Sequence, residues 1–306
     1  MIKFGINKQF RDQNFLFGVG YIRGAAFDDF PIHTHGFTEL VIIMKGRGSH
    51  WVEGSTYQII PGDVFVFKGE QAHGFKGIRG AHMVNLSFVP SSFPPVPEEF
   101  KTLPGYNALF TLEPVYRRQR HFQSRLSLSR GQLTFVENLV MRMESEQSAC
   151  PPGWREMLKA LFLELIIYLS RCYEGIQGGE ELRMLELGGI LSFMEGHYAE
   201  RLNLPKLAKR ANMSVNNFLR VFKKASGFTP MEYLLRLRIG GACTRLLASP
   251  QRIADVALAT GFNDSNYFSR QFRLVTGLSP REFRRSPKAQ EIKAGLFLGK
   301  LSSRKA

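Results

Sequence analysis

The sequence predicts an α+β chain of several domains: a small N-terminal β-barrel, a helical segment, and a C-terminal all-α domain with two helix-turn-helix units. Three observations lead to this prediction. The last third of the chain contains an internal repeat, the positive charge gathers in the same third, and short β-rich runs separated by glycine and proline fill the first third. At 306 residues the chain is long enough for domains with separate cores.

The repeat is the strongest signal. Its two copies are LAKRANMSVNNFLRVFKKASGFTPMEY and VALATGFNDSNYFSRQFRLVTGLSPREF, which align at an offset of 50 residues from Asn216 onward and of 49 before the turn. Each copy predicts a short helix, a tight turn, a second helix and a glycine stop. The long helix expected between the copies, about 231–248, separates the two units by a length suited to successive major-groove faces.

Local signals fix the ends of these helices. Ser214 is expected to cap the second helix of the first copy, and Asp264 or Ser265 that of the second. Gly227 and Gly277 follow these helices where a left-handed residue is needed. Thr-Pro and Ser-Pro pairs then start the next helix in each copy.

Each second helix is expected to bury phenylalanines and to expose a polar, basic face. Arginine on such a face can pair with guanine, asparagine can pair with adenine, and lysine can hold phosphate. A merely solvated helix would show a similar face, but its repetition in the basic part of the chain favours nucleic acid. The candidate DNA-contacting residues are Ser214, Asn216, Asn217, Arg220, Lys223, Lys224, Ser265, Asn266, Tyr267, Arg270 and Arg273.

The net charge of +15 is unevenly divided along the chain. Residues 1–182 hold 19 Lys+Arg against 18 Asp+Glu, whereas residues 183–306 hold 22 against 8. A domain this basic attracts phosphate backbone, although a membrane surface would attract the same charge. The sequence shows no secretion signal and no membrane span, and its three cysteines have no metal-type spacing, so a cytoplasmic location is expected.

The motif GFNDSNYFSRQFRLVTGLSPREFRR, at 261–285, resembles the signature of the AraC/XylS family of bacterial transcription regulators. IADVALATGF, at 253–262, is similar to the helix that precedes it, and the resemblance extends over about 183–286. It implies a regulator, expected to be an activator, that binds double-stranded promoter DNA. It further implies a homodimer, and contact with RNA polymerase if the protein activates.

The N-terminal part carries a histidine motif. The runs ELVIIMKGRG, TYQIIPGDVFVFKGEQAH and HMVNLSF predict a small antiparallel barrel or sandwich. Two histidines that alternate on a strand point to the same face, so His33 and His35 could join Glu39 and His73 around a divalent metal. The same four residues are the candidates for lining a ligand pocket without a metal.

The spacing of His33, His35, Glu39 and Gly46 resembles the first motif of the cupin fold. The second motif, from Pro61 to His73, is longer than in metal-binding cupins and looks more like AraC-family sensor domains, where such histidines line a sugar pocket. Within that family the N-terminal half looks most like the rhamnose-responsive activators, which implies a monosaccharide effector. A cupin-type metal-dependent sugar isomerase or oxygenase and a non-specific DNA-binding protein remain the alternatives.

Helical apolar spacing marks residues 131–146 and 155–171 between the two ends. The second segment carries an apolar stripe that fits either a core face against the barrel or a subunit contact. The expected domains are a ligand-sensing barrel at 1–95, a helical linker and dimerisation segment at 96–180, the DNA-binding domain at 183–286, and a frayed tail at 287–306. The stripe consists of Leu158, Leu161, Phe162, Leu165 and Leu169.

Overall fold

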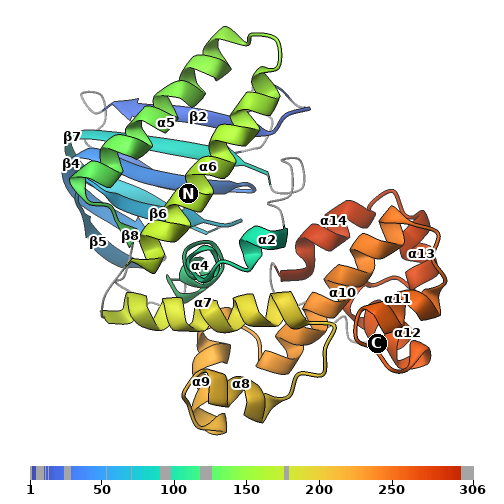
Figure 1. The fold of residues 1–306 in the computed structure, drawn as a ribbon. Coiled ribbons are helices and arrows are strands. Elements are labelled where there is room, and N and C mark those ends of the chain that lie inside the picture. The colour runs from blue at the N-terminus through green and yellow to red at the C-terminus, as the bar shows by residue number, and fades with distance from the viewer. Residues whose placement is uncertain are drawn as a thin grey trace. The chain divides into compact units, whose positions relative to one another are not determined.

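The structure is a computed structural model that describes residues 2–4, 10, 12, 14–23, 29–52, 54–69, 71–89, 98–117, 126–175 and 179–297. The chain forms two compact units, 1–189 and 190–306, each treated by itself below (Figure 1). The division falls within helix α7 (Gly179–His197). The proline-rich stretch at 91–97, expected to follow the barrel, and the end of the tail at 298–306 lie outside the described residues.

Within the described part of the first unit, eight strands form one sheet in the order β1-β3-β7-β4-β6-β8, with β2 paired to β7 and β5 paired to β4. All pairs are antiparallel except the parallel pair of β1 and β3. The strands are β1 (Ile2–Phe4), β2 (Phe17–Arg23), β3 (Asp29–His35), β4 (Thr38–Val52), β5 (Ser55–Ile59), β6 (Asp63–Phe67), β7 (His73–Phe88) and β8 (Leu126–Ser127).

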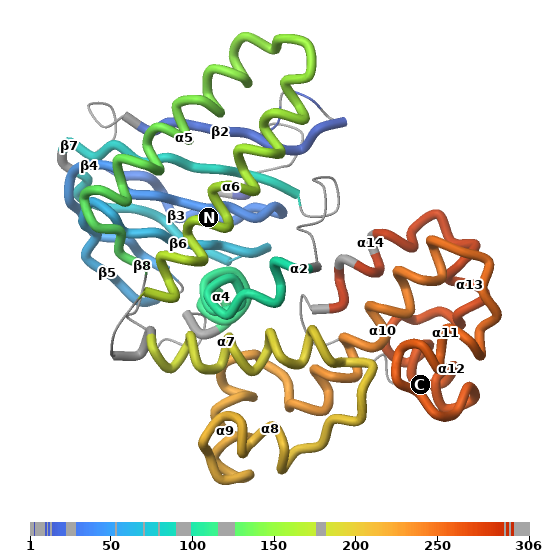
Figure 2. The backbone as a smooth tube through the Cα atoms, viewed as in Figure 1, coloured from blue at the N-terminus to red at the C-terminus, as the bar shows by residue number. Residues whose placement is uncertain are grey.

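The two longest strands, β4 and β7, set the shape of this sheet. Their register shifts repeatedly between Ile43 and Ser49, and each shift marks an irregularity that bends a strand and increases its twist. The first half of β4 therefore pairs with β6, and its second half pairs with β5 (Figure 2). The same bend brings the start of β7 beside β3, where His33 and His73 lie opposite each other.

Both faces of the sheet are buried. Alternate residues of β4, Val41 and Ile43, join Phe65 and Phe67 of β6 in an aromatic-rich core on one face. The helices α5 (Arg130–Ala149) and α6 (Trp154–Glu174) lie across the sheet (Figure 1). The Phe162 ring of α6 packs edge-on against a ring of β2 and a ring of β7. The helices therefore cover the face of the sheet opposite the aromatic core.

The apolar stripe of α6 belongs to this core, because all five of its residues are buried within the unit. The core-face interpretation of the stripe is confirmed, and a subunit contact would have to use another face of the helix. Short helices connect the sheet to this pair, and a π-helical turn that the sequence did not suggest lies among them. They are α2 (Glu98–Lys101), α3 (Pro104–Tyr106), η1 (Asn107–Leu112) and α4 (Glu113–Arg117).

The second unit is helical and shows the repeat in three dimensions. A long helix, α10, contacts the helix pair before it through Tyr233, which packs against Phe222. Its later residues, among them Ile239 and Leu246, share a core with the pair that follows. The helices are α8 (Leu204–Arg210), α9 (Val215–Ser226), α10 (Pro230–Ala248), α11 (Ile253–Ala259), α12 (Ser265–Thr276) and α13 (Pro280–Arg285).

The expected helix ends are confirmed. Ser214 caps α9 and Asp264 caps α12, so Asp264 and not Ser265 is the cap in the second copy. Gly227 and Gly277 adopt φ values of +81° and +80° at the ends of these helices. Thr229 and Ser279 each form a complete capping box with the glutamate three residues on. The two copies therefore use the same backbone signals.

The expectation of a frayed tail from residue 287 onward is wrong for its first part. Helix α14 (Ala289–Ala294) and a 3-10 turn, Gly295–Phe297, follow the repeat. Ala289 and Leu296 are buried in the core that the second copy shares with α10. A short helix with so few apolar positions gives a weak sequence pattern, and its order comes from contacts with distant residues.

A substitution at Gly277 tests whether the end of α12 needs a residue with left-handed backbone angles. No atom lies near a Cβ added there, so Gly277→Ala should cost only the backbone strain of φ +80°, about 1–2 kcal/mol in the free energy of unfolding. Gly240→Ala, within α10 and in ordinary contact with Leu296, should instead stabilise the helix by up to about 1 kcal/mol. Denaturant unfolding of the two variants should show opposite shifts, and equal shifts would contradict the assignment.

Candidate functional site

The first candidate surface is the solvent face of α9. Asn216, Asn217, Arg220 and Lys223 are exposed there, whereas Lys224 is half-buried. The exposed Ser214 at the start of the helix accepts a hydrogen bond from the Asn217 amide at 3.4 Å. The Arg220 guanidinium donates to the Asn217 side-chain oxygen at 2.9 Å, so these two side chains are already oriented together on the free protein.

The solvent face of α12 has the same organisation. Asn266, Tyr267, Arg270 and Arg273 are exposed, and Ser265 is exposed at the first turn. Asp264 accepts the Tyr267 backbone N–H at 2.6 Å. Every residue that the sequence places on the reading surface, apart from the half-buried Lys224, is therefore accessible.

Buried phenylalanines hold both faces outward. Phe218 and Phe222 of α9 lie edge-to-face at 5.4 Å, and Phe268 and Phe272 of α12 repeat the contact at 5.5 Å. All four rings are fully buried. Because the rings occupy one side of each helix, the polar side chains have to lie on the other.

The two copies differ in charge. Lys209 and Lys224 of the first copy correspond to Leu258 and Leu274 of the second. These leucines are 70% and 72% exposed, so side chains at these positions are accessible from solvent. The first copy therefore offers more cations to a phosphate backbone than the second.

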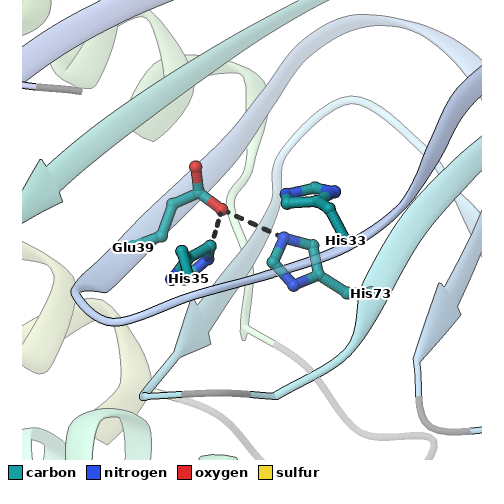
Figure 3. Close-up of side chains that lie close together, drawn as sticks. All are labelled: His33, His35, Glu39 and His73. Atoms are coloured by element: carbon teal, nitrogen blue, oxygen red, sulfur yellow. Dashed lines mark hydrogen bonds and ion pairs between the residues drawn. The ribbon is translucent and has the colours of Figure 1, made fainter. Parts of the chain in front are cut away.

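The second candidate site lies inside the sheet of the first unit. His33 and His35 of β3, Glu39 of β4 and His73 of β7 are buried, and the sheet brings them together as the sequence suggests (Figure 3). Each offers one ligand atom, and these atoms lie within 4.8 Å of one another. Glu39 Oε2 lies 3.3 Å from His35 Nε2 and 3.1 Å from His73 Nε2.

Backbone carbonyls hold the three imidazole rings in place. The Nδ1 atoms of His33, His35 and His73 lie 3.0, 2.9 and 3.1 Å from the carbonyl oxygens of Pro31, Phe37 and Gln71. A carbonyl oxygen only accepts hydrogen bonds, so each Nδ1 carries the hydrogen. The Nε2 atoms of His35 and His73 then face the Glu39 carboxylate.

Burial and mutual contacts shift the ionisation of this group. Burial, helped by the nearby His73, lowers the pKa of His33 to about 4, so its ring is neutral at pH 7. Burial alone would raise the pKa of the Glu39 carboxyl. Its contacts with His35 and His73 outweigh burial and hold that pKa well below its usual range, so Glu39 is ionised.

Two neighbours of the quartet were missed by sequence reasoning. The Asn85 side-chain amide donates to Glu39 Oε1 at 2.9 Å and leaves Oε2 facing the histidines. His50, which showed no pattern in the sequence, is fully buried, and its ring stacks on Phe75 at 4.2 Å. Asn85 lies on the same strand as His73, but the signal that places it here is the β4–β7 register rather than a local motif.

Comparison with known protein families divides the chain in the same way as the structure. Residues 207–286 match the family model of a helix-turn-helix domain. Residues 18–166 match that of an AraC-like ligand-binding domain. The chain therefore combines a DNA-binding domain with a small-molecule-binding domain, which is the architecture of a ligand-responsive transcription regulator.

Curated relatives give the same answer along most of the chain. An HTH-type transcriptional activator RhaS of Escherichia coli O6:H1 is 30% identical over 84% of this chain and 88% of its own length. A RhaS of Escherichia fergusonii is 29% identical over 83% of this chain and 87% of its own. Among solved structures, the DNA-binding domain of AdpA in complex with a target DNA is 28% identical, covering 34% of this chain and 95% of that one, with a TM-score of 0.32.

The chain belongs to the AraC family of DNA-binding transcription regulators. Members of this family are not enzymes, so the isomerase and oxygenase alternatives do not apply. No helix in the part of the chain that the structure describes combines the length and the apolar character needed to cross a membrane.

The charge difference between the copies gives a test on α12. Leu274→Lys restores the cation that the first copy has at this position, and a new phosphate contact should steepen the fall of log affinity with log salt by about one. Leu274→Gln, which is polar but uncharged, is the matched control. Titration of duplex DNA at several salt concentrations measures the slope, and an unchanged slope would mean that this position faces away from DNA.

Proposed function

We propose that the chain activates transcription from a bacterial promoter when a small polar effector binds its N-terminal unit. A monosaccharide such as rhamnose is the effector class that we propose, in line with the resemblance to rhamnose-responsive activators. The curated relatives named transcriptional activators support activation over repression. The proposal places the protein in the cytoplasm as a homodimer that contacts promoter DNA and RNA polymerase.

The observation that carries the proposal is the repeated exposed polar helix. In this proposal α8–α9 and α11–α12 are two helix-turn-helix units, and α9 and α12 are their recognition helices. Asn216, Arg220, Asn266 and Arg270 occupy matching exposed positions on α9 and α12. Arginine and asparagine are the side chains that pair bidentately with guanine and adenine in the major groove.

The remaining candidate residues take supporting roles. Lys223, Lys224 and Arg273 supply charge to the phosphate backbone, and Ser214 and Ser265 lie at the helix starts, where phosphate contacts are common. Asn217 and Tyr267 occupy the same position in the two copies, beside the reading arginines. A difference there would let the two helices read different bases.

The proposed sensor is the β-barrel of residues 1–95, with the buried quartet of His33, His35, Glu39 and His73 as its ligand-binding group. Residues 96–180 then link sensor and reader and pair the subunits, and 183–286 form the DNA-binding domain. In this proposal the subunit contact uses the solvent faces of α5 and α6, where Phe135, Met141 and Met157 are exposed. An effector acts by binding one arrangement of the dimer more tightly than the other.

Arg220→Ala and Arg270→Ala test base reading. Each variant should lose about 1–3 kcal/mol of binding free energy on the promoter and relax the preference at one base position, because a bidentate base contact is removed. Arg47→Ala, an exposed arginine of β4 outside the proposed subunit contact, is the charge-matched control. Gel-shift titrations on the promoter and on single-base variants measure both effects.

The same titrations distinguish a non-specific DNA-binding protein. Such a protein would bind promoter and random duplex equally, with a steep salt dependence. If both arginine variants lost the same binding free energy on every sequence, these residues would contact only phosphates. That result would overturn the assignment of base reading to them.

A further inference from the structure

We propose that the buried quartet of His33, His35, Glu39 and His73 binds a divalent transition-metal ion of the first row. The ligand held directly by these side chains would then be a metal ion. The inference rests on the proposed role of the quartet as the ligand-binding group of the sensor. It names the chemical class of that ligand.

The spacing of the four donors fits one ion. Their ligand atoms lie within 4.8 Å of one another. Bonds of about 2.0–2.1 Å to a zinc-like ion place tetrahedral donors about 3.3–3.4 Å apart, so side-chain shifts of up to about 1 Å would close the site. The four side chains point toward a common centre (Figure 3).

The orientation of the histidine rings turns their free nitrogens toward this centre. Each Nδ1 faces a backbone carbonyl and donates its hydrogen to it. The other ring nitrogen, Nε2, is then the atom left to bind a metal ion. The Nε2 atoms of His35 and His73 lie 3.3 and 3.1 Å from Glu39 Oε2, so these three atoms are gathered at one point.

The fourth donor, His33, lies close to the other three. Its ring centre lies 4.3 Å from that of His73. Buried polar groups are costly unless they are paired. One divalent ion would bind the ring nitrogens of His33, His35 and His73 and the carboxylate of Glu39 at a single point.

The surroundings hold the donors as outer-shell groups hold metal ligands. Hydrogen bonds from the remote ring nitrogen to a carbonyl fix the orientation of metal-binding histidines. Asn85 does the same for Glu39 by holding Oε1 at 2.9 Å. The rings of His35 and His73 stack on Phe37 and Phe67 at 4.1 and 4.2 Å, which restricts their rotation.

The donor set selects the class of metal. Three imidazole nitrogens and one carboxylate oxygen suit zinc, iron, cobalt, nickel or copper. Calcium and magnesium prefer sites built from oxygen. We therefore expect first-row ions to bind and calcium and magnesium to fail.

The test uses the full chain, freed of metal with a chelator and titrated with Co²⁺ and Zn²⁺ by calorimetry and by Co²⁺ visible absorption. The expected result is a single ion per chain with a nitrogen-and-oxygen ligand spectrum, and no binding of Ca²⁺. Glu39→Gln preserves the size of the side chain but removes its charge, and should weaken binding at least 100-fold. Asn85→Ala should weaken it about 10- to 100-fold without changing the stoichiometry.

His82→Ala removes an exposed histidine of β7 outside the quartet and is the matched control, expected to bind the ion as the unaltered chain does. Circular dichroism of each metal-free variant checks its fold. Failure of the folded, unaltered chain to take up either ion would overturn the proposal, and so would equal uptake by Glu39→Gln.

The outcome is independent of DNA reading. Gel shifts of the metal-free chain on promoter DNA report on α9 and α12, which carry none of the quartet. Normal DNA binding without metal uptake would refute only the proposed metal site. Metal uptake without sequence-specific DNA binding would refute only the proposed reading of DNA.

Discussion

The burial of four phenylalanines determines what the second unit presents to its surroundings. Phe218 and Phe222 fix one side of α9 in the core, and Phe268 and Phe272 fix the same side of α12. This burial fixes the rotation of each helix about its axis. The asparagine and arginine side chains on the opposite side therefore face solvent. The glycine stops and capping boxes set where each helix ends, so the two polar faces are matched along their length. The proposed reading of DNA by α9 and α12 depends on that one-sided burial.

The first unit follows a comparable rule with the opposite result. There the sheet buries three histidines and a glutamate beside aromatic rings. Burying polar groups is costly unless they are paired, and the carbonyl contacts of the rings meet only part of that requirement. A buried group of this kind is a reason to expect a small ligand. The exposed polar groups of α9 and α12 are instead suited to a polyanion such as DNA.

The sequence predicted those features that depend on neighbours along the chain. Ser214, Gly227 and Thr229 act through bonds to residues a few positions away, and the strand alternation of His33 and His35 is equally local. Features set by pairing between distant segments could not be predicted. Asn85 reaches Glu39 only because of the register between β4 and β7, and Ala289 and Leu296 are ordered by contacts with α10. The frayed tail was expected because those contacts leave no periodic pattern in a short segment.

Hydroxyl-radical footprinting of the full chain on the DNA upstream of its neighbouring transcription units tests the central claim most directly. If α9 and α12 are both recognition helices, as proposed, each subunit should give paired protected segments about 10–10.5 base pairs apart, one for each major-groove face. A single protected segment per subunit, or uniform protection without preferred positions, would contradict the account.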